Sequence, residues 1–299
     1  MNGFTGEFAG LATAICWTAT AMSFQVASRR IGSVQVNLIR LVLAFIFYLA
    51  YSKIFLNQWL PFDAPLNAWI YLSISGVIGF VLGDYFLFKS YEFISSKISM
   101  LIMTLAPPVA ALLGWFMLGE KFSWMNTLGM SLVLGGVAMV VLKKDITNGT
   151  KQMRYPLKGI LFALLGAIGQ GVGAVFSKKG MGDYDPFASS QIRVITGIIG
   201  FAIMISIMKK WGMVYKGVND KKASKALLIG SFFGPFLGVS LGMIAFKFTS
   251  LGIASTLMAT VPVFILLPSH IILKEKLTLN EVFGAIVAVA GIGIFFLKI

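Results

Sequence analysis

The sequence is poor in charge, and only 12% of its 299 residues are Asp, Glu, Lys or Arg. Hydrophobic residues make up 58% of the chain, and the mean hydropathy is +0.87. A soluble domain carries about twice that share of charged residues, because polar groups have to cover much of its surface. No water-soluble fold of this size hides so much apolar surface, so we expect an integral membrane protein.

Cysteine, histidine and acidic residues are also scarce, with one Cys, one His and 11 Asp plus Glu. A single cysteine forms neither an internal disulfide nor a CxxC metal pair. The sequence has no Ser-His-Asp pattern, no HExxH motif and no Walker loop. It also lacks the clustered acids or histidines that a membrane-embedded acyl or glycosyl transferase needs. We therefore expect no enzyme activity, no cofactor and no metal.

Basic residues outnumber acidic ones, and the net charge is +14. The cations fall between apolar stretches rather than on a basic face interleaved with aromatics, so we expect no nucleic-acid partner. The N-terminal MNGFTGEF has no basic region before the first apolar stretch and contains Glu7. This pattern predicts a retained first helix rather than a cleaved signal peptide.

Ten stretches are apolar enough to be membrane-spanning helices, which need about 20 mostly apolar residues. They are residues 5–28, 34–54, 67–88, 92–117, 123–142, 157–179, 187–208, 224–247, 252–273 and 279–297. The longest polar stretches, 143–156 and 209–223, are both cationic. If the N-terminus is outside, 17 cations lie in inner loops and 6 at outer ends. The positive-inside rule then predicts a multi-pass plasma-membrane protein with both termini outside.

The two halves of the chain resemble each other. At a shift of 155 residues Pro107 coincides with Pro262 and Glu120 with Glu275, and at a shift of 153 Arg40 coincides with Arg193. Proline and charged residues are rare in membrane spans, so these matches mean more than matches of Leu or Ile. Each half holds five spans, an odd number, so the second half lies upside down. We predict an all-α membrane protein of ten transmembrane helices in two inverted five-helix repeats, residues 1–145 and 157–299.

A family signature occurs once in each half, at residues 105–137 and 260–292. It reads LAPPVAALLGWFMLGEKFSWMNTLGMSLVLGGV and TVPVFILLPSHIILKEKLTLNEVFGAIVAVAGI. A Pro-containing fourth helix, a turn with Glu, a Ser or Thr three residues on and a Gly-patterned fifth helix resemble the EamA-type branch of the drug/metabolite transporter superfamily. The second copy departs from the first in having Lys274 where the first has Gly119. The resemblance implies ten helices in inverted repeats and movement of metabolites or amino acids, often export.

Arg40 and Arg193 lie inside predicted spans, and Asp84, near the inner end of the third span, is the acid most embedded in an apolar span. Charges at such depth are costly and are usually paired or face water. We expect an Arg40–Asp84 ion pair toward the inner side, as a gate or as a structural tie, and Asp84 is the best candidate for proton coupling. The position equivalent to Asp84 in the second half is Val239. Arg193 is therefore expected to find another acid, such as Glu7 or one in an outer loop.

Prolines within predicted spans mark candidate kinks, at Pro107, Pro108 and Pro262. Proline removes a backbone donor and bends a helix, and the freed carbonyls can line a cavity. Two interpretations stay open, a bend linked to function and a static kink needed for packing. The recurrence of the kink in both halves favours the first.

The turns that hold Glu120 and Glu275 also allow two interpretations. An ion-coupling carboxylate is one, but each Glu lies beside a Lys at the membrane edge, which favours a structural role in the turn. Ser123 and Thr278 are predicted N-caps of the following helices. Thr278 with Glu281 forms a predicted capping box.

Polar and aromatic side chains on the first, third, fourth, sixth and ninth spans form the candidate wall of a substrate cavity, which would suit amphipathic or aromatic solutes. The alternative is ordinary hydrogen bonding between helices. The candidates are Trp17, Thr20, Gln25, Tyr85, Ser99, Met103, Thr104, Gln170, Ser177, Ser255, Thr256 and Thr260.

These features predict a secondary transporter of small metabolites, an exporter of amino acids or related amphipathic or aromatic solutes that works by alternating access. The expected partners are the lipid bilayer and a small-molecule substrate, with protons as the candidate coupling ion. The paired halves suit a monomer or a homodimer. The alternative is a membrane scaffold or receptor that transports nothing.

Overall fold

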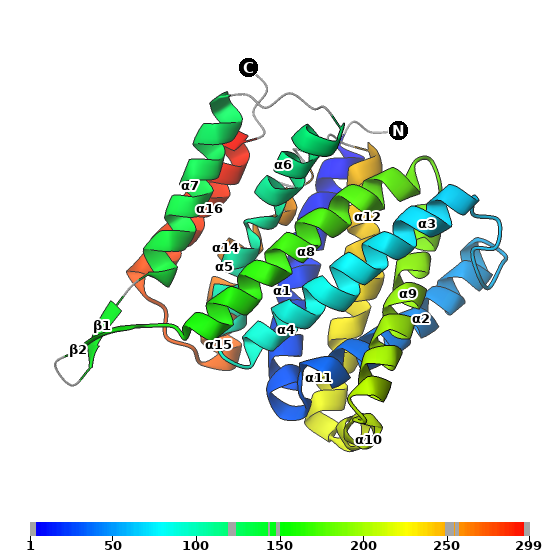
Figure 1. The fold of residues 1–299 in the computed structure, drawn as a ribbon, viewed down its shortest axis with the longest axis horizontal. Helices are drawn as coiled ribbons and strands as arrows, with labels where there is room; N and C mark the ends of the chain where they lie inside the picture. Colours follow the sequence, from blue (N-terminus) through cyan, green and yellow to red (C-terminus); the bar gives the residue numbers. More distant parts are fainter. Residues whose placement is uncertain are drawn as a thin grey trace.

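The computed structural model describes residues 4–118, 124–142, 144–147, 150–248, 254 and 257–295. Its helices run side by side in a bundle, and a short antiparallel hairpin projects from one edge (Figure 1). The first half and the hairpin contain α1 (Thr5–Ile31), α2 (Ser33–Phe55), α3 (Leu66–Ser75), the π-helical segment η1 (Gly76–Asp84), α4 (Tyr85–Tyr91), α5 (Ser96–Met103), α6 (Ala106–Leu118), α7 (Trp124–Val141), β1 (Lys144–Thr147) and β2 (Thr150–Met153). The second half contains α8 (Leu157–Met181), α9 (Pro186–Ile207), α10 (Trp211–Asn219), α11 (Lys221–Ser231), the π-helical segment η2 (Phe232–Gly238), α12 (Val239–Phe248), α14 (Val261–Phe264), α15 (Leu266–Leu273) and α16 (Leu279–Phe295).

Local chemistry explains the corners between helices. Gly32 separates α1 from α2 with φ 86°, a conformation that costs glycine little because it has no Cβ. At the start of α9, Asp185 accepts hydrogen bonds from the backbone N–H groups of Phe187 and Ala188, both at 2.9 Å. Pro186 occupies the first turn of α9, where its missing N–H is not needed.

The predicted spans 92–117 and 252–273 are each divided rather than continuous. In the first, α5 ends at Met103 and α6 begins at Ala106, one residue before Pro107. In the second, α14 begins at Val261, one residue before Pro262. The two restarts lie at equivalent positions of the repeat, because a proline at each site lacks the N–H that would continue the preceding helix.

The third span of each half contains a π-helical segment. The shift of 155 residues maps η1 onto residues 231–239, and η2 occupies 232–238. Two stretches of the same rare geometry at equivalent positions indicate that the halves share a backbone fold and not only a hydropathy pattern. Such segments frequently occur at functional sites.

The third span of each half packs closely against the first helix of the other half. A Cβ atom on Gly173 of α8 would lie 3.0 Å from the Cα atom of Gly79 in η1. At the equivalent place in the other pairing, a Cβ atom on Gly234 of η2 would lie 2.6 Å from the Cγ2 atom of Thr20 in α1. These reciprocal contacts relate the halves by an approximate two-fold axis.

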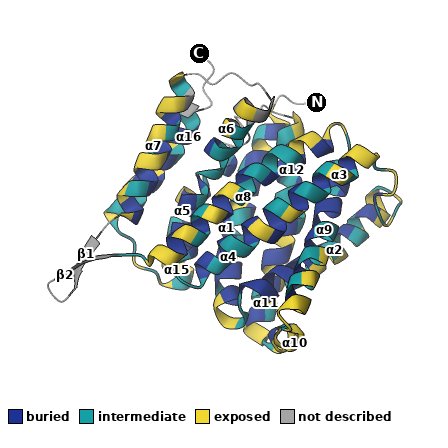
Figure 2. Ribbon diagram, viewed as in Figure 1, coloured by how far each residue is buried: buried dark blue, intermediate teal, exposed yellow. Residues whose placement is uncertain are grey.

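Five stretches of helix are long and apolar enough to cross a membrane. They are Ser33–Phe55, Leu66–Tyr91, Leu157–Met181, Pro186–Ile207 and Lys221–Phe248. Helix α1 has the length, with 27 residues, but is not among these five, and the remaining apolar helices are shorter. The number of ten spans therefore stays a prediction. Exposed residues mark the outward faces of α3, α7 and α8 (Figure 2), and apolar ones such as Leu134 and Leu165 are among them.

Candidate functional site

A cluster of polar residues lies where the two halves meet inside the bundle, and we call it the central cluster: Asn37, Arg40, Asp84, Gln170 and Arg193. Nη2 of Arg40 donates a short, charge-assisted hydrogen bond to Oδ2 of Asp84, so the predicted pair is present. Nε of Arg40 donates to Oδ1 of Asn37 at 2.9 Å. Arg40 is 3% exposed and Asp84 is 7% exposed, so the pair is shielded from water and its charges interact strongly.

Gln170 connects this pair to the second half. Its Nε2 donates to Oδ1 of Asp84 at 2.5 Å and to the carbonyl oxygen of Gly79 at 3.1 Å. The close approach has a visible cause, because a Cβ atom on Gly169 would lie 2.7 Å from the Cα atom of Gly83. Two facing glycines thus bring α8 against η1, and the next residue on α8 reaches the carboxylate.

Arg193 adds a second guanidinium beside the same carboxylate. It is 7% exposed, its Cζ lies 4.4 Å from the ring centroid of Phe80, and its charge interacts with that of Asp84. Its Nε has no hydrogen-bond partner, and no ion pair joins Arg193 to another residue that the structure describes. The acid whose charge acts on Arg193 is Asp84, and an interaction with Glu7 or another outer acid stays a prediction. Arg193 lies over the ring of Phe80, and the repeat places Val239 where the first half has Asp84.

The central cluster carries one excess positive charge among aromatic rings. The Cζ atom of Arg40 lies 4.8 Å from the ring centroid of Phe88, 5.6 Å from that of Phe80 and 5.7 Å from that of Phe24. Aromatic faces attract cations but offer them no hydrogen bonds. Two arginines share one carboxylate, so an anion that reached this place would find an uncompensated charge and a free donor.

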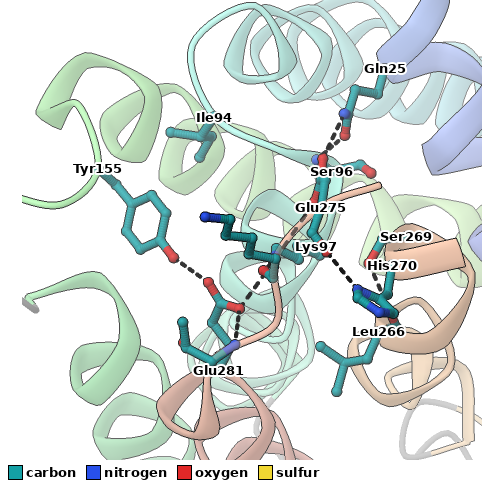
Figure 3. A network of polar contacts seen from close by, with 12 residues as sticks. Gln25, Ile94, Ser96, Lys97, Tyr155, Leu266, Ser269, His270, Glu275 and Glu281 are labelled. Atoms are coloured by element: carbon teal, nitrogen blue, oxygen red, sulfur yellow. Dashed lines mark hydrogen bonds and ion pairs between the residues drawn. The ribbon is translucent and has the colours of Figure 1, made fainter. Parts of the chain in front are cut away.

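A second polar cluster lies near one end of the bundle, where α5 begins and α15 ends (Figure 1). We call it the end cluster: Gln25, Ser96, Lys97, Tyr155, Glu275 and Glu281. Nζ of Lys97 donates to Oε2 of Glu281 at 3.0 Å and to the carbonyl oxygen of Lys276 at 2.6 Å, and it lies 3.9 Å from Oε2 of Glu275. The hydroxyl of Tyr155 donates to Oε1 of Glu281 at 2.5 Å. Figure 3 shows these side chains converging between the helices.

The end cluster ties the two halves together. Gln25 donates to Oε1 of Glu275 at 3.0 Å and accepts a short hydrogen bond from the backbone N–H of Ser96. Lys97 and Glu281 are 7% and 4% exposed. The cavity between them is about 10 Å³, which is barely the space of one water molecule. The halves are therefore closed against each other at this end.

The turn residues are partly as predicted. The backbone N–H of Thr278 donates to Oε2 of Glu281 at 3.1 Å, which is one half of a capping box. The hydroxyl of Thr278 has no partner among the residues that the structure describes, so the other half of the box is not formed there. Glu275 contacts Gln25 and Lys97 across the repeat boundary, which is more than a turn requires. Glu120 and Ser123 lie outside the described residues.

The predicted wall residues do not share one environment. Gln25 and Gln170 belong to the two clusters. Ser99 and Ser177 are fully buried and bond to Ser90 at 2.8 Å and to Ser75 at 2.7 Å, as ordinary helix contacts do. The hydroxyls of Thr20, Thr104 and Thr260 bond to carbonyl oxygens of their own helical turns, while Trp17, Tyr85 and Met103 pack against apolar side chains. Ser255 and Thr256 lie outside the described residues.

Sequence reasoning missed the part that Lys97, Tyr155 and Glu281 play. Lys97 counted as an inner-loop cation and Glu281 as a helix cap, because each lies beside a turn. One signal was present in the sequence: Lys97 is followed directly by the apolar run ISMLIM, so its side chain begins a buried helix. Tyr155 gave no such signal, since it precedes a proline in a polar stretch.

Comparison with known proteins agrees with this arrangement. The sequence profile of the EamA-like transporter family matches residues 4–142 and 157–297. The human protein named "Solute carrier family 35 member G1" is 25% identical over 163 residues, which are 53% of this chain and 44% of that protein. An "Uncharacterized transporter" of Clostridium kluyveri is 25% identical over 177 residues, 59% of this chain and 56% of that protein. The match thus spans about half the length of these two relatives.

Two further comparisons extend over more of the chain. An "Uncharacterized transporter" of Archaeoglobus fulgidus is 23% identical over 219 residues, 73% of this chain and 74% of that protein. A solved crystal structure aligns with a TM-score of 0.70 and 15% identity over 98% of this chain and 96% of that one. At that identity the structural likeness shows the fold alone.

Proposed function

Because the chain belongs to the EamA-like transporter family, we propose that it is a secondary transporter that exports amino acids or related amphipathic or aromatic solutes by alternating access. The family and its relatives are membrane transporters and not enzymes. The substrate class, the direction and the mechanism are the proposal.

The observation that carries it is the central cluster, which is shared between the inverted halves. Asp84 and Arg40 come from the first half, and Gln170 and Arg193 come from the second. In transporters built from inverted repeats the substrate site lies near the midplane at the interface of the repeats. Hydrogen bonds and charge interactions across this interface change when one half moves against the other.

The charge of the central cluster favours a substrate with a carboxylate. Arg193 is a buried cation without a hydrogen bond among the described residues, and a guanidinium binds a carboxylate through two parallel N–H donors. The surrounding rings of Phe24, Phe80 and Phe88 suit an apolar or aromatic body. An amino acid supplies both groups. Asp84, held between two arginines, is the proposed proton-coupling group.

The end cluster supports closure at one side of the membrane. The repeat relates Lys97 to Gly252 and Glu281 to Asn126, so the opposite end has no equivalent ion pair. On the predicted topology, with both termini outside a plasma membrane, the Lys97–Glu281 end faces the cytoplasm. We propose that this pair holds the inner side shut and that export requires it to part.

The experiment is transport by purified protein in vesicles. L-phenylalanine, 3-phenylpropionate and phenethylamine share a phenyl ring and differ in the carboxylate and the amine. We expect the first two to move and phenethylamine to be excluded, with an imposed proton gradient changing the rate. An Arg193→Gln variant that still moves L-phenylalanine as fast as the parent would contradict the assigned role of Arg193.

The rival interpretation is a scaffold or receptor. It predicts that no solute of a metabolite panel moves, even in vesicles whose protein is folded and correctly inserted. Transport that is indifferent to pH gradients would remove only the proton-coupling role from Asp84.

A further inference from the structure

The cationic stretch 209–223, predicted as an inner loop, contains helix α10 (Trp211–Asn219). It joins α9 to α11, and both neighbours belong to stretches that qualify as membrane spans. At a rise of 1.5 Å per residue α10 is about 14 Å long, too short to cross a bilayer. The helix therefore lies where the chain leaves the membrane and enters it again.

One side of α10 packs against the protein. Gly217 is buried, and a Cβ atom there would lie 3.0 Å from Cδ1 of Ile31 at the end of α1. Val214 packs against the apolar cluster between α2 and α9. Nε2 of Gln35 donates a hydrogen bond to the sulfur of Met213 at 3.7 Å. These contacts fix which way the helix faces.

The exposed surface of α10 is divided into an apolar and a polar flank. At 100° per residue, Trp211, Tyr215 and Val218 share one flank. They are 48%, 74% and 53% exposed, and exposed apolar side chains that lie together mark sites of interaction with proteins or membranes. Gly212, Lys216 and Asn219 share the other flank and are also exposed. A helix with this division suits the boundary between lipid and water.

The residues around α10 are strongly cationic. Residues 209–225 contain six lysines and one acid, Asp220. Asp220 is engaged by Arg30, whose Nη2 donates to it at 2.8 Å. The lysines that the structure shows exposed are Lys209, Lys216, Lys221, Lys222 and Lys225, and none forms an ion pair with another described residue.

Hydrogen bonds fix the junctions of α10 with α9 and α11. Asp220 caps α11 by accepting from the backbone N–H groups of Lys222 and Ala223, at 3.0 and 2.9 Å. The indole N–H of Trp211 donates to the hydroxyl of Ser206 in the last turn of α9, at 3.0 Å. These hydrogen bonds hold α10 against the ends of α9 and α11, so its apolar flank and the neighbouring lysines lie on one ordered surface.

We propose that the segment 209–225 is a membrane-surface site for anionic lipid. Trp211, Tyr215 and Val218 insert among the acyl chains beside the headgroups, and the lysines bind the phosphates of anionic headgroups. Basic groups next to a membrane are attracted to anionic lipids within a Debye length. The inference rests on the position of α10 and on charge, and it holds whether or not the chain transports amino acids.

The test first replaces the single cysteine of the chain, so that a thiol-reactive label attaches only at a chosen position. In a Cys16→Ser background, Tyr215→Cys and the matched control Lys216→Cys place a bimane label on opposite flanks of α10. The protein is reconstituted in nanodiscs of phosphatidylcholine, alone or mixed with phosphatidylglycerol. We expect the label at residue 215 to emit further to the blue, to be quenched by nitroxide-labelled lipid and to be protected from aqueous iodide. The label at residue 216 should stay open to iodide.

Headgroup selection is read from the change between the two lipid mixtures. Phosphatidylglycerol should increase the lipid quenching at residue 215, and Lys216→Gln/Lys221→Gln/Lys222→Gln should abolish the increase. Lys178→Gln/Lys179→Gln, at the far end of α8 (Figure 1), is the control for charge alone and should retain it. Equal iodide quenching at residues 215 and 216 would overturn the membrane site. Insertion that ignores phosphatidylglycerol would overturn its preference for anionic lipid.

Discussion

Gly136 in α7 and Gly284 in α16 are so close that a Cβ atom on either would meet the carbonyl oxygen of the other, at 2.7 and 2.8 Å. The reciprocal contact lies about two turns along, where a Cβ atom on Gly291 would be 2.9 Å from the carbonyl oxygen of Gly129. The shift of 155 residues relates Gly136 to Gly291 and Gly129 to Gly284, so the repeat maps one contact onto the other. The fifth helices of the two halves therefore run antiparallel, as inverted repeats require.

The first prediction concerns this contact. Gly136→Ala should push α7 from α16, because its new methyl group meets backbone that cannot rotate away. Overpacking of this kind costs about 1–3 kcal/mol. Gly135→Ala is the matched control, since no atom of the described part of the chain lies within 4 Å of its Cβ position. Thermal unfolding in nanodiscs should separate the two variants, and equal melting temperatures would contradict the close packing.

The second prediction concerns the Arg40–Asp84 pair. Asp84→Asn leaves two buried arginines without a carboxylate, and Arg40→Gln removes the cation that hydrogen-bonds to Asp84, so each variant breaks a buried ion pair at a cost of about 3–5 kcal/mol. Both should therefore lower the melting temperature and abolish transport. The charge-swapped Arg40→Asp/Asp84→Arg protein should recover part of the stability. A swapped protein as inactive as either single variant would count against an interaction that depends only on the pair.

The third prediction tests closure by the end cluster. Lys97→Gln should loosen the contact with Glu275 and Glu281, because both carboxylates then lose their buried cation. In a Cys16→Ser background, Ser99→Cys lies within one turn of Lys97 and is buried. We expect Lys97→Gln to speed its reaction with a membrane-impermeant thiol reagent applied from the cytoplasmic side.

The control for that measurement is Ser52→Cys. Ser52 is equally buried, and it bonds to Gln191 at 3.0 Å, far from the end cluster. Its reactivity should be the same with Lys97 or with Gln at position 97. An unchanged rate at residue 99 would show that the ion pair does not hold this end shut.

The fourth prediction is a pH dependence at the junction of α10 and α11, which lies outside the membrane-spanning segments. The hydrogen bonds from Arg30 lower the pKa of Asp220 from its ordinary 3.8 to about 2. A depressed folded-state pKa contributes stability that is fully present above the unfolded value and is lost as pH falls toward the folded value. Below a pH of about 4 the junction should therefore weaken progressively. A spin label at Tyr215→Cys should gain mobility over that range.

Asp220→Asn provides the comparison for the pH effect. The amide cannot ionise, so the label in this variant should be mobile at neutral pH and should change little on acidification. A parent protein whose label mobility stays constant down to a pH of about 2 would contradict the contribution of Asp220.

Much of the architecture was predictable because it follows from local chain properties. Hydropathy indicates the membrane, and rare residues such as Pro107 and Pro262 align the halves. Proline chemistry predicts an interruption within the fourth span of each half, and the helices do restart there. The Arg40–Asp84 pair was also predictable, since a charge within an apolar span needs a partner of opposite sign. The π-helical form of η1 and η2 was not, because no residue pattern specifies it.

From the amino acids alone one can infer an integral membrane protein, its internal repeat, and the prolines that bend its fourth and ninth spans. The folded structure was needed to show that Arg193 lies over the ring of Phe80 and interacts with the charge of Asp84, and that Lys97 pairs with Glu281, 184 residues away. Helical and apolar preferences act between neighbours in the chain and can be read along it. A buried charge is paired by whichever helix the fold brings beside it, and here that helix comes from the opposite half.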